Sequence, residues 1–234
     1  MSAMRAAILT GAGGGIGGAI AQALARDGWR VIGLDLAFPR ENASLHRSIE
    51  VDLRDESVLR ATLRELLATE TVRGLVNCAG IFPVERFVES DSESWRTQVD
   101  VNFLAPIIAC HEVVPVLVEA GEGRIVNITS ESSRSGAARL AVYAGTKGGL
   151  LSFSKSLAQE LGRSGVTVNC ISPGTIETAG TDVAMAQKIA RNIPLGRIGT
   201  PRDVAPAVAF LMGEGADYIT GQVLSVGGGL TMIG

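Results

Sequence analysis

The feature that most constrains the fold of this chain is the alternation of short apolar runs with longer segments of helical spacing. The apolar runs hold four to six residues each and cover residues 6–9, 30–34, 48–51, 74–77, 124–128, 166–171 and 223–226. Helices are predicted between them at residues 15–27, 55–69, 95–119, 142–163 and 203–212. Strands that are apolar on both faces and separated by helices are typical of a parallel sheet covered on both sides. The sequence therefore predicts one α/β domain over residues 1–234, with a seven-stranded, doubly wound parallel sheet.

A glycine-rich turn lies where the first predicted strand meets the first predicted helix. Six of the 29 glycines of the chain fall between positions 11 and 18. Glycine allows a tight turn and lets backbone N–H groups reach a pyrophosphate at the helix N-terminus. No Gly-Lys-Ser/Thr follows, so the turn is not a P-loop. The turn predicts nucleotide binding, and a purely structural glycine turn is the alternative.

Asp35 ends the second predicted strand, 24 residues after Gly11. A carboxylate at this place can accept hydrogen bonds from both hydroxyls of an adenosine ribose, and it would repel a 2′-phosphate. No Arg occupies positions 12 to 16 to pair with such a phosphate. Asp35 therefore predicts NAD as the cofactor in preference to NADP, with a solvated loop carboxylate as the alternative.

Tyr143 and Lys147 lie four residues apart near the start of the 142–163 helix, which places them on one helix face. A free tyrosine has a pKa of about 10 and is a poor base at neutral pH. A fixed cation nearby favours the phenolate, so we expect Lys147 to lower the pKa of Tyr143. This spacing arises often by chance, and its meaning depends on the motifs around it.

Taken together, the motifs resemble those of the classical short-chain dehydrogenase/reductase family. They are Thr10-Gly11 through Gly17, Asn77-Cys78-Ala79-Gly80, Ser130, Tyr143-x-x-x-Lys147 and Pro173-Gly174, in the family's order and spacing. Ser130 precedes Tyr143 by 13 residues, which is similar to the Ser–Tyr pair of that family. Thr129 and Ser132 are nearby hydroxyls, and only the spacing selects Ser130. The resemblance covers nearly the whole chain and implies a Rossmann fold.

The resemblance also implies roles for individual residues. Tyr143 is expected to act as the general acid/base, and Ser130 to orient the substrate oxygen. Lys147 is expected to hold the nicotinamide ribose and to lower the pKa of Tyr143, while Asn102 completes a proton relay to water. The implied cofactor-binding residues are Gly11, Gly15, Ile16, Gly17, Asp35, Asp52, Leu53, Asn77, Ala79, Gly80, Tyr143, Lys147, Pro173, Gly174, Ile176 and Thr178.

Four positions depart from the family pattern. Cys78 stands where a second Asn is common, and Gly227 replaces a frequent Asp. Glu131 and Arg134 are more polar than the pattern suggests. We expect these two side chains to face water or, as the alternative, substrate.

The resulting prediction is an oxidoreductase that transfers hydride between NAD(H) and a secondary alcohol or ketone. One alternative within the family is a 3-oxoacyl-thioester reductase acting on acyl carrier protein. From other classes, a non-catalytic NAD-sensing regulator is weakened by the intact Ser130, Tyr143 and Lys147 set. A methyltransferase on a similar sheet would not explain the Tyr–Lys spacing.

Composition limits the partners. Lysine plus arginine total 21 and aspartate plus glutamate 24, giving a net charge of −3, so nucleic-acid binding is not expected. Two histidines weaken the case for a metal site, and no strongly apolar stretch predicts a membrane span. Three separated cysteines favour a reduced, cytoplasmic compartment. The family resemblance suggests a homotetramer built on the 95–119 and 142–163 helices, with residues 178–196 as part of a substrate lid.

Overall fold

A parallel sheet of seven strands forms the centre of the computed structural model, which describes residues 5–39, 41–178 and 183–232. The strands are β1 (Ala6–Thr10), β2 (Arg30–Asp35), β3 (Leu45–Glu50), β4 (Val72–Asn77), β5 (Gly123–Ile128), β6 (Val166–Pro173) and β7 (Val223–Val226). Their order in the sheet is β3-β2-β1-β4-β5-β6-β7, and every pairing is parallel. The predicted seven-stranded, doubly wound parallel sheet is confirmed.

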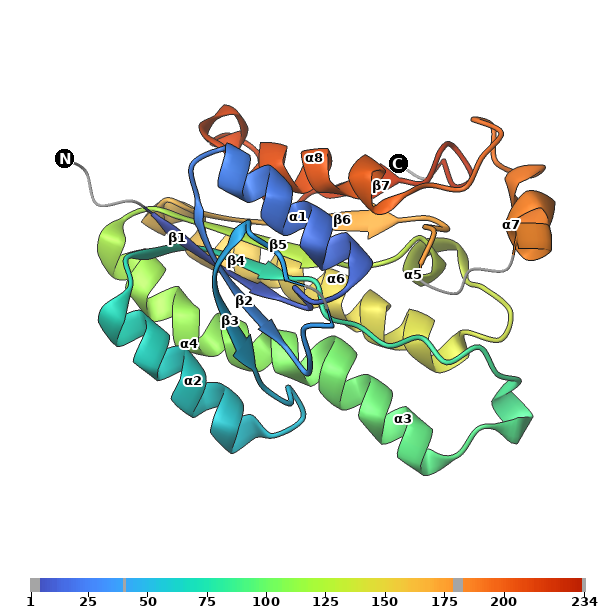
Figure 1. Cartoon of the computed structure of the whole chain (residues 1–234), viewed down its shortest axis with the longest axis horizontal. Helices are drawn as coiled ribbons and strands as arrows, with labels where there is room; N and C mark the ends of the chain where they lie inside the picture. Colours follow the sequence, from blue (N-terminus) through green and yellow to red (C-terminus); the bar gives the residue numbers. More distant parts are fainter. Residues whose placement is uncertain (1–4, 40, 179–182, 233–234) are drawn as a thin grey trace.

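Helices cover both faces of this sheet (Figure 1). One face carries α1 (Gly15–Arg26) and α8 (Pro201–Met212), and the other carries α2 (Glu56–Thr69), α4 (Ala105–Ala120) and α6 (Ala141–Leu161). Two shorter helices, α5 (Ser132–Ser135) and α7 (Val183–Ala190), belong to the connections, and α3 (Ser92–Val99) continues through a π-helical turn into α4. This is the two-sided covering that the apolar strands require.

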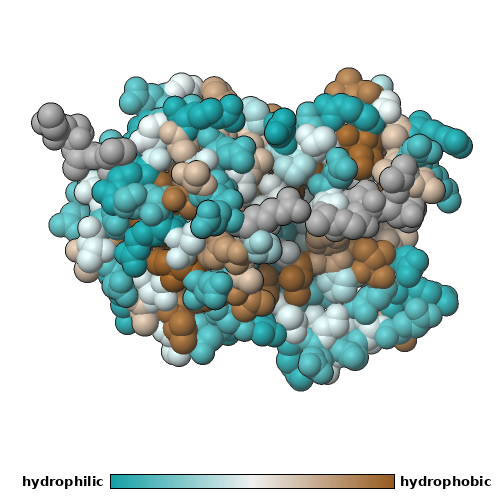
Figure 2. All heavy atoms as spheres, in the orientation of Figure 1, coloured by the Kyte–Doolittle hydropathy of each residue, from teal (hydrophilic) through white to brown (hydrophobic). Residues whose placement is uncertain are grey.

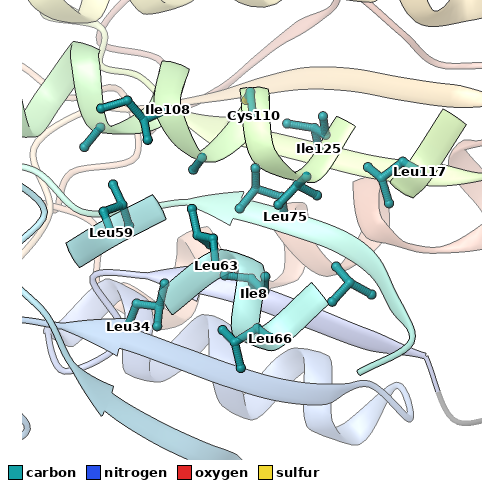
Figure 3. Close-up of a cluster of buried hydrophobic side chains, with 14 of the residues drawn as sticks. Ile8, Leu34, Leu59, Leu63, Leu66, Leu75, Ile108, Cys110, Leu117 and Ile125 are labelled. Carbon is teal, nitrogen blue, oxygen red and sulfur yellow. The ribbon is translucent and has the colours of Figure 1, made fainter. Parts of the chain in front are cut away.

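Two apolar cores lie on the two faces of the sheet. The core beneath α2 and α4 contains Ile8, Leu34, Leu75 and Ile125 from the strands with Leu59, Leu63, Leu66, Ile108 and Leu117 from the helices (Figure 3). Each fully buried aliphatic side chain of this kind stabilises the fold by about 1.5–3 kcal/mol. The second core joins α1 and α8 to the opposite face through residues such as Ile20, Val204 and Val208.

A charged cluster also fixes α2 against α4. Glu112 on α4 binds Arg60 at 2.6 Å and Arg64 at 2.8 Å, both on α2. Hydrogen bonds from these two guanidinium groups hold the pKa of Glu112 at about 2, against the opposing effect of burial.

The strand order reverses between β1 and β4, and this reversal positions the site. β1 pairs with β2 on one side and with β4 on the other, so the loops that follow β1 and β4 leave the sheet in different directions. In doubly wound sheets the crevice at such a point, outside the carboxyl ends of the strands, is where ligands bind. The glycine turn after β1 and the Asn77–Gly80 turn after β4 meet at this edge.

The structure differs from the predicted elements in three places. β3 begins at Leu45 rather than Ser48, and its side chains alternate between half-buried and exposed because it is an edge strand. The predicted 95–119 helix begins at Ser92, ends at Ala120 and contains a π-helical turn, Asp100–Leu104. Helix α7 lies within the predicted 178–196 lid, of which residues 179–182 are outside the described part of the chain.

The helical segment Ser92–Ala120 is long and apolar enough to cross a membrane by length and composition alone. Part of this apolarity has a structural reason, because residues such as Ile108, Val113 and Leu117 are buried beneath the sheet. The expectation of no membrane span therefore remains a prediction.

Candidate active site

The glycine turn after β1 brings two backbone segments into close contact. Gly11 has a φ of +72°, and a Cβ there would lie 2.6 Å from the Ala79 nitrogen. A Cβ on Gly17 would lie 2.7 Å from the carbonyl carbon of Gly11, in the first turns of α1. Only glycine fits at these two places. The turn therefore presents a bare backbone at the start of a helix, as a pyrophosphate-binding site requires.

Asp35 lies beside this turn at the end of β2, where the sequence placed it. One of its carboxylate oxygens accepts a hydrogen bond from the Gly13 N–H at 2.8 Å, and the other accepts from Leu36 N–H at 2.7 Å. The carboxylate thus helps to shape the turn and also places negative charge at its rim.

Asp52 and Leu53 follow β3 at the same edge of the sheet. The Asp52 carboxylate is engaged by the Arg54 side chain, with an ion pair of 2.6 Å, and hydrogen bonds from Arg54 lower its pKa. Leu53 is buried in the core beneath α2.

The turn after β4 is held by Thr10, which begins the glycine motif in the sequence and had been given no role of its own. The Thr10 hydroxyl oxygen accepts hydrogen bonds from the Cys78 N–H at 3.1 Å and the Ala79 N–H at 3.3 Å. Its position as the last residue of β1, directly before the first glycine, was the available signal.

Asn77 was expected to line the cofactor, and the structure corrects this for its side chain. The Asn77 amide is buried and donates to Asn127 Oδ1 at 2.8 Å, and Asn127 in turn donates to the Ser154 hydroxyl at 2.8 Å. This chain of bonds joins β4, β5 and α6 inside the molecule. Ala79 and Gly80, by contrast, lie at the carboxyl edge, and Gly80 is exposed.

Lys147 and Asn102 converge on Gly80. Lys147 is only 2% exposed, and its Nζ donates to the Ile128 carbonyl oxygen at 2.9 Å. The Asn102 side chain accepts from Ile81 N–H at 2.9 Å and donates to Ile81 C=O at 2.8 Å, which fixes the loop after Gly80. A Cβ on Gly80 would lie 3.2 Å from Asn102 Oδ1 and 3.3 Å from Lys147 Nζ. The absence of that Cβ lets both buried polar groups pack closely against the Gly80 backbone.

Tyr143 lies one helical turn before Lys147, and Ser130 is near the Tyr143 phenol, where its hydroxyl acts to lower the phenol pKa. Ser130 Oγ also accepts a hydrogen bond from the Ser132 hydroxyl at 2.9 Å. The neighbouring Thr129 hydroxyl donates instead to the Ile171 carbonyl of β6 at 3.0 Å and faces the interior. Of these three hydroxyls, Ser130 is the one in contact with Tyr143. The Phe82 ring covers the phenol, with centroids 6.0 Å apart.

The pKa of Tyr143 differs from the expectation. Burial raises this pKa above its ordinary value, and the hydrogen bond from Ser130 opposes the shift without reversing it. The Lys147 ammonium lies 6.0 Å from the centroid of the Tyr143 ring and is directed at the Ile128 carbonyl. Burial also lowers the pKa of Lys147 to about 8, which weakens it as a permanent cation. The predicted lowering of the Tyr143 pKa by Lys147 is therefore wrong for this arrangement.

The loop after β6 forms the opposite wall of the crevice. Pro173 ends β6, Gly174 N–H donates to the Val226 carbonyl at 3.0 Å, and Ile176 pairs with Gly199 in an isolated parallel bridge. Thr178 is exposed at the end of this segment. These residues lie at and after the carboxyl end of β6, at the same edge of the sheet as the glycine turn.

Glu131 was expected to face water or substrate, and the structure buries it. The residue is 4% exposed and lies at the edge of a cavity of about 570 Å³ formed with residues 194–199 and 225–231. Burial raises the pKa of its carboxyl group, opposed by the Thr231 hydroxyl and the Arg134 charge. Arg134 in turn donates to the Ser225 hydroxyl at 2.7 Å.

The donor set fits a dinucleotide and does not form a metal centre. A bare glycine turn at the N-terminus of α1, a carboxylate at its rim and a lysine beside Gly80 suit a pyrophosphate and two riboses. Within residues 5–39, 41–178 and 183–232, no group of three or more His, Cys, Asp or Glu side chains is placed to hold a metal ion.

The fold and the arrangement of the site are those of a nicotinamide-dependent oxidoreductase. A family model described as Enoyl-(Acyl carrier protein) reductase matches residues 11–231. The chain belongs to the short-chain dehydrogenase/reductase family.

Relatives of known sequence cover nearly the whole chain. Nodulation protein G of Rhizobium meliloti (strain 1021) is 36% identical over 240 residues, which span 98% of each chain. The 3-oxoacyl-[acyl-carrier-protein] reductase of Rattus norvegicus is 36% identical over 93% of this chain and 94% of its own length. A solved structure from Beutenbergia cavernae, described as a candidate NAD(P)-dependent gluconate 5-dehydrogenase with NADP bound at low occupancy, has a TM-score of 0.93 and 35% identity, covering 98% of this chain and 97% of its own.

Proposed function

We propose that this oxidoreductase transfers hydride between NAD(H) and a secondary alcohol or its ketone. The observation that carries the proposal is the position of Tyr143 one helical turn before the buried Lys147, with the Ser130 hydroxyl near the phenol. In its reduced form the nicotinamide supplies the hydride. The residues of the chain bind and orient the reactants and move the proton at the substrate oxygen.

The proton step follows from the state of Tyr143. With its pKa raised by burial, the phenol is protonated at neutral pH and donates its proton to the carbonyl oxygen as a ketone is reduced. Ser130 donates a hydrogen bond to the same oxygen and keeps it within reach of the phenol. In the direction of alcohol oxidation Tyr143 accepts the proton, so oxidation is expected to accelerate as the pH rises.

Substitution of Tyr143 tests the mechanism. Tyr143→Phe removes the proton donor and is expected to lower kcat at least about a hundredfold while NADH binding is retained. Steady-state turnover and an NADH fluorescence titration measure the two effects. The matched control is Tyr218→Phe, because the second tyrosine of the chain is fully exposed. Turnover near that of the wild type in Tyr143→Phe would refute the proposed role.

The preference for NAD over NADP rests on Asp35. Its carboxylate stands at the rim of the glycine turn, where it would repel a 2′-phosphate. Asp35→Asn retains an acceptor for the Gly13 N–H but removes the charge, and NADP(H) affinity is expected to rise about tenfold relative to NAD(H). Tighter binding of NADP(H) than of NAD(H) by the wild-type protein would overturn this preference. The NADP-bound solved relative makes this comparison necessary.

Reduction of 3-oxoacyl thioesters is the second candidate, and a groove beside the site favours it. The groove has a volume of about 670 Å³, includes Gly80 to Pro83 and begins next to the Lys147 ammonium. Phe82 is 50% exposed and Val84 56%, which offers an apolar surface to an acyl chain. Asp91 and Glu93 also line this groove and would repel an anionic carrier.

A substrate panel separates the two candidates. Acetoacetyl-CoA, acetoacetate methyl ester and simple secondary alcohols are assayed by absorbance of NADH under one set of conditions. Preference for the uncharged substrates supports the first candidate. A kcat/KM for acetoacetyl-CoA more than about a hundredfold above that for the ester would favour the thioester reductase instead.

A further inference from the structure

The Glu131 carboxylate is enclosed between two glycines that belong to different elements. A Cβ on Gly174, just after β6, would lie 3.0 Å from Glu131 Oε2. A Cβ on Gly227, just after β7, would lie 2.5 Å from the same oxygen, and its three nearest heavy atoms all belong to the Glu131 carboxyl group. The carboxyl group therefore occupies the space that a side chain at position 227 would need.

Gly227 owes its identity to this contact and not to its backbone. Its φ is outside the left-handed region, unlike the φ of +65° at Gly228 and +89° at Gly229. Any L-residue could adopt its backbone conformation. Two departures from the family pattern, a glutamate at 131 and a glycine at 227, are thus coupled, because the glutamate side chain fills the space that the glycine leaves.

The backbone of Glu131 is tied to the same neighbours and is continuous with Ser130. Glu131 N–H donates to the Pro173 carbonyl at 3.0 Å, and the Ser133 hydroxyl donates to the Ser130 carbonyl at 2.6 Å. Ser130 is the residue that hydrogen-bonds Tyr143. A displacement of the Glu131 side chain is therefore passed directly to the serine of the site.

The carboxyl group sits in this space by its shape. Within the described part of the chain, both oxygens are buried and neither has a hydrogen-bond partner. The polar groups that face the carboxyl group are the Thr231 hydroxyl and the Arg134 side chain of the same loop. Across the cavity, Arg197 and Asp203 form an ion pair with each other at 2.6 Å. An unpartnered carboxylate in such a place is costly, whereas the neutral acid is tolerated.

We propose that Glu131 is a positioning residue that fixes Ser130 by filling the space left by Gly174 and Gly227. The inference rests on the proposed role of Ser130 in the site. Because shape carries the effect, glutamine is expected to replace Glu131, whereas aspartate and alanine are not. Ala at position 227 is expected to displace the carboxyl group and to act through the same contact.

The first readout is the pKa of Tyr143, which needs no substrate. In a Tyr218→Phe background Tyr143 is the single tyrosine, so its ionisation is followed by absorbance near the phenolate band. Ser130→Ala removes the hydrogen bond that opposes the upward shift and is expected to raise the Tyr143 pKa further. Glu131→Ala and Gly227→Ala are expected to raise it in the same direction, and Glu131→Gln to leave it unchanged. An unchanged Tyr143 pKa in Glu131→Ala would overturn the proposal.

The second readout is the double-mutant cycle in turnover. Glu131→Ala and Gly227→Ala are each expected to lower kcat about tenfold with cofactor binding unchanged, and their combination to be no worse than either alone. A product of the two effects, about a hundredfold, would mean independent roles and would refute the proposal. Retained activity in Glu131→Asp with loss in Glu131→Gln would show that charge, not shape, matters, and would refute it too. Gly162→Ala is the control, because a Cβ there meets nothing within 4 Å.

The two readouts separate this inference from the proposed function. If the wild-type protein turned over none of the substrates, the proposed function would fail while the Tyr143 titration still decided the link between Glu131 and Ser130. If turnover and Tyr143→Phe behaved as expected but Glu131→Ala left both readouts unchanged, the inference would fail alone.

Discussion

Burial of the Lys147 ammonium lowers the stability of the fold. A lysine that is 2% exposed, with one carbonyl partner among the described hydrogen bonds, loses most of its hydration. Burial accordingly lowers its pKa from 10.5 to about 8. The chain keeps the ammonium beside Gly80 at the expense of stability, as is common for groups that serve a reaction.

This cost is expected to appear as a pH dependence of stability. Between pH 8 and 10.5 the unfolded chain retains the Lys147 proton and the folded chain releases it, so the free energy of unfolding rises with pH. The full shift corresponds to ~3 kcal/mol. Urea unfolding of the wild type and of Lys147→Met at several values between pH 7 and 9.5 measures the difference, in which contributions of the buried thiols cancel. Lys147→Met is expected to be the more stable protein at pH 7, with an advantage that shrinks as the pH rises. An advantage independent of pH would contradict the assignment.

For single residues, the sequence predicted which residues belong to the site better than it predicted the directions of their side chains. Motif spacing identified Ser130, Tyr143 and Lys147, which the structure brings together. It did not reveal that the Asn77 side chain turns inward or that Glu131 is enclosed by the glycines that follow β6 and β7. Those facts depend on neighbours about 50 and 100 positions away in the chain, and no local pattern records them.

Among the elements, the π-helical turn Asp100–Leu104 has the clearest consequence for the site. A π turn inserts an extra residue into a helix and rotates the side chains that follow. Here it lies between α3 and α4 and carries Asn102, whose amide is aimed at the backbone of Ile81. The apolar pattern of residues 95–119 reads as one continuous helix, so the sequence did not predict this irregularity.

The first turns of α1 offer a test at the same scale with a built-in control. Gly17→Ala places a Cβ 2.7 Å from the carbonyl carbon of Gly11 and is expected to open the turn. Gly18→Ala meets nothing closer than 3.7 Å and is expected to stabilise the helix by up to ~1 kcal/mol. NADH titration and thermal unfolding measure both variants. Equal cofactor affinity in the two would show that close packing of the turn does not matter for binding.

Strands and long helices were predictable because burial on both faces leaves a strong pattern. β1, β2, β5 and β6 are apolar along their length and were found within two residues of their bounds. β3 is an edge strand whose exposed side chains, His46, Ser48 and Glu50, are polar, and three of its residues were missed. Helix α7 has eight residues and lies in a connection, where too little burial is available to mark it.

At the scale of the whole molecule, exposed apolar side chains lie in several places on the described part of the chain, and two groups besides Phe82 and Val84 are candidate contact surfaces. Figure 2 shows hydrophilic side chains around the rim of one face and hydrophobic ones in a band across its middle. On the helical segment Ser92–Ala120, Val99, Leu104 and Val118 are 41%, 40% and 39% exposed. On α8 and the edge strand β7, Phe210 is 48% and Leu224 42% exposed. We predict that further copies of the chain bind at these two groups of residues, because large exposed apolar patches mark interaction sites.

A closed tetramer with two-fold symmetry needs two separate self-complementary surfaces on each chain. The family resemblance predicts a homotetramer built on the 95–119 and 142–163 helices, whereas the exposed apolar residues named above lie on Ser92–Ala120 and on α8 with β7. We therefore expect the protein to have a solution mass four times that of its 24.3 kDa chain. Leu104→Arg and Phe210→Arg are each expected to leave dimers, because a stable contact needs about 1,200–2,000 Å² and tolerates no unpaired charge at its centre. Light scattering after size-exclusion chromatography measures the mass. Val58→Arg, at an equally exposed apolar position on α2, is the control and should remain tetrameric. A wild-type monomer, or a tetramer that survives both arginine substitutions, would mean that these regions do not bind further copies of the chain.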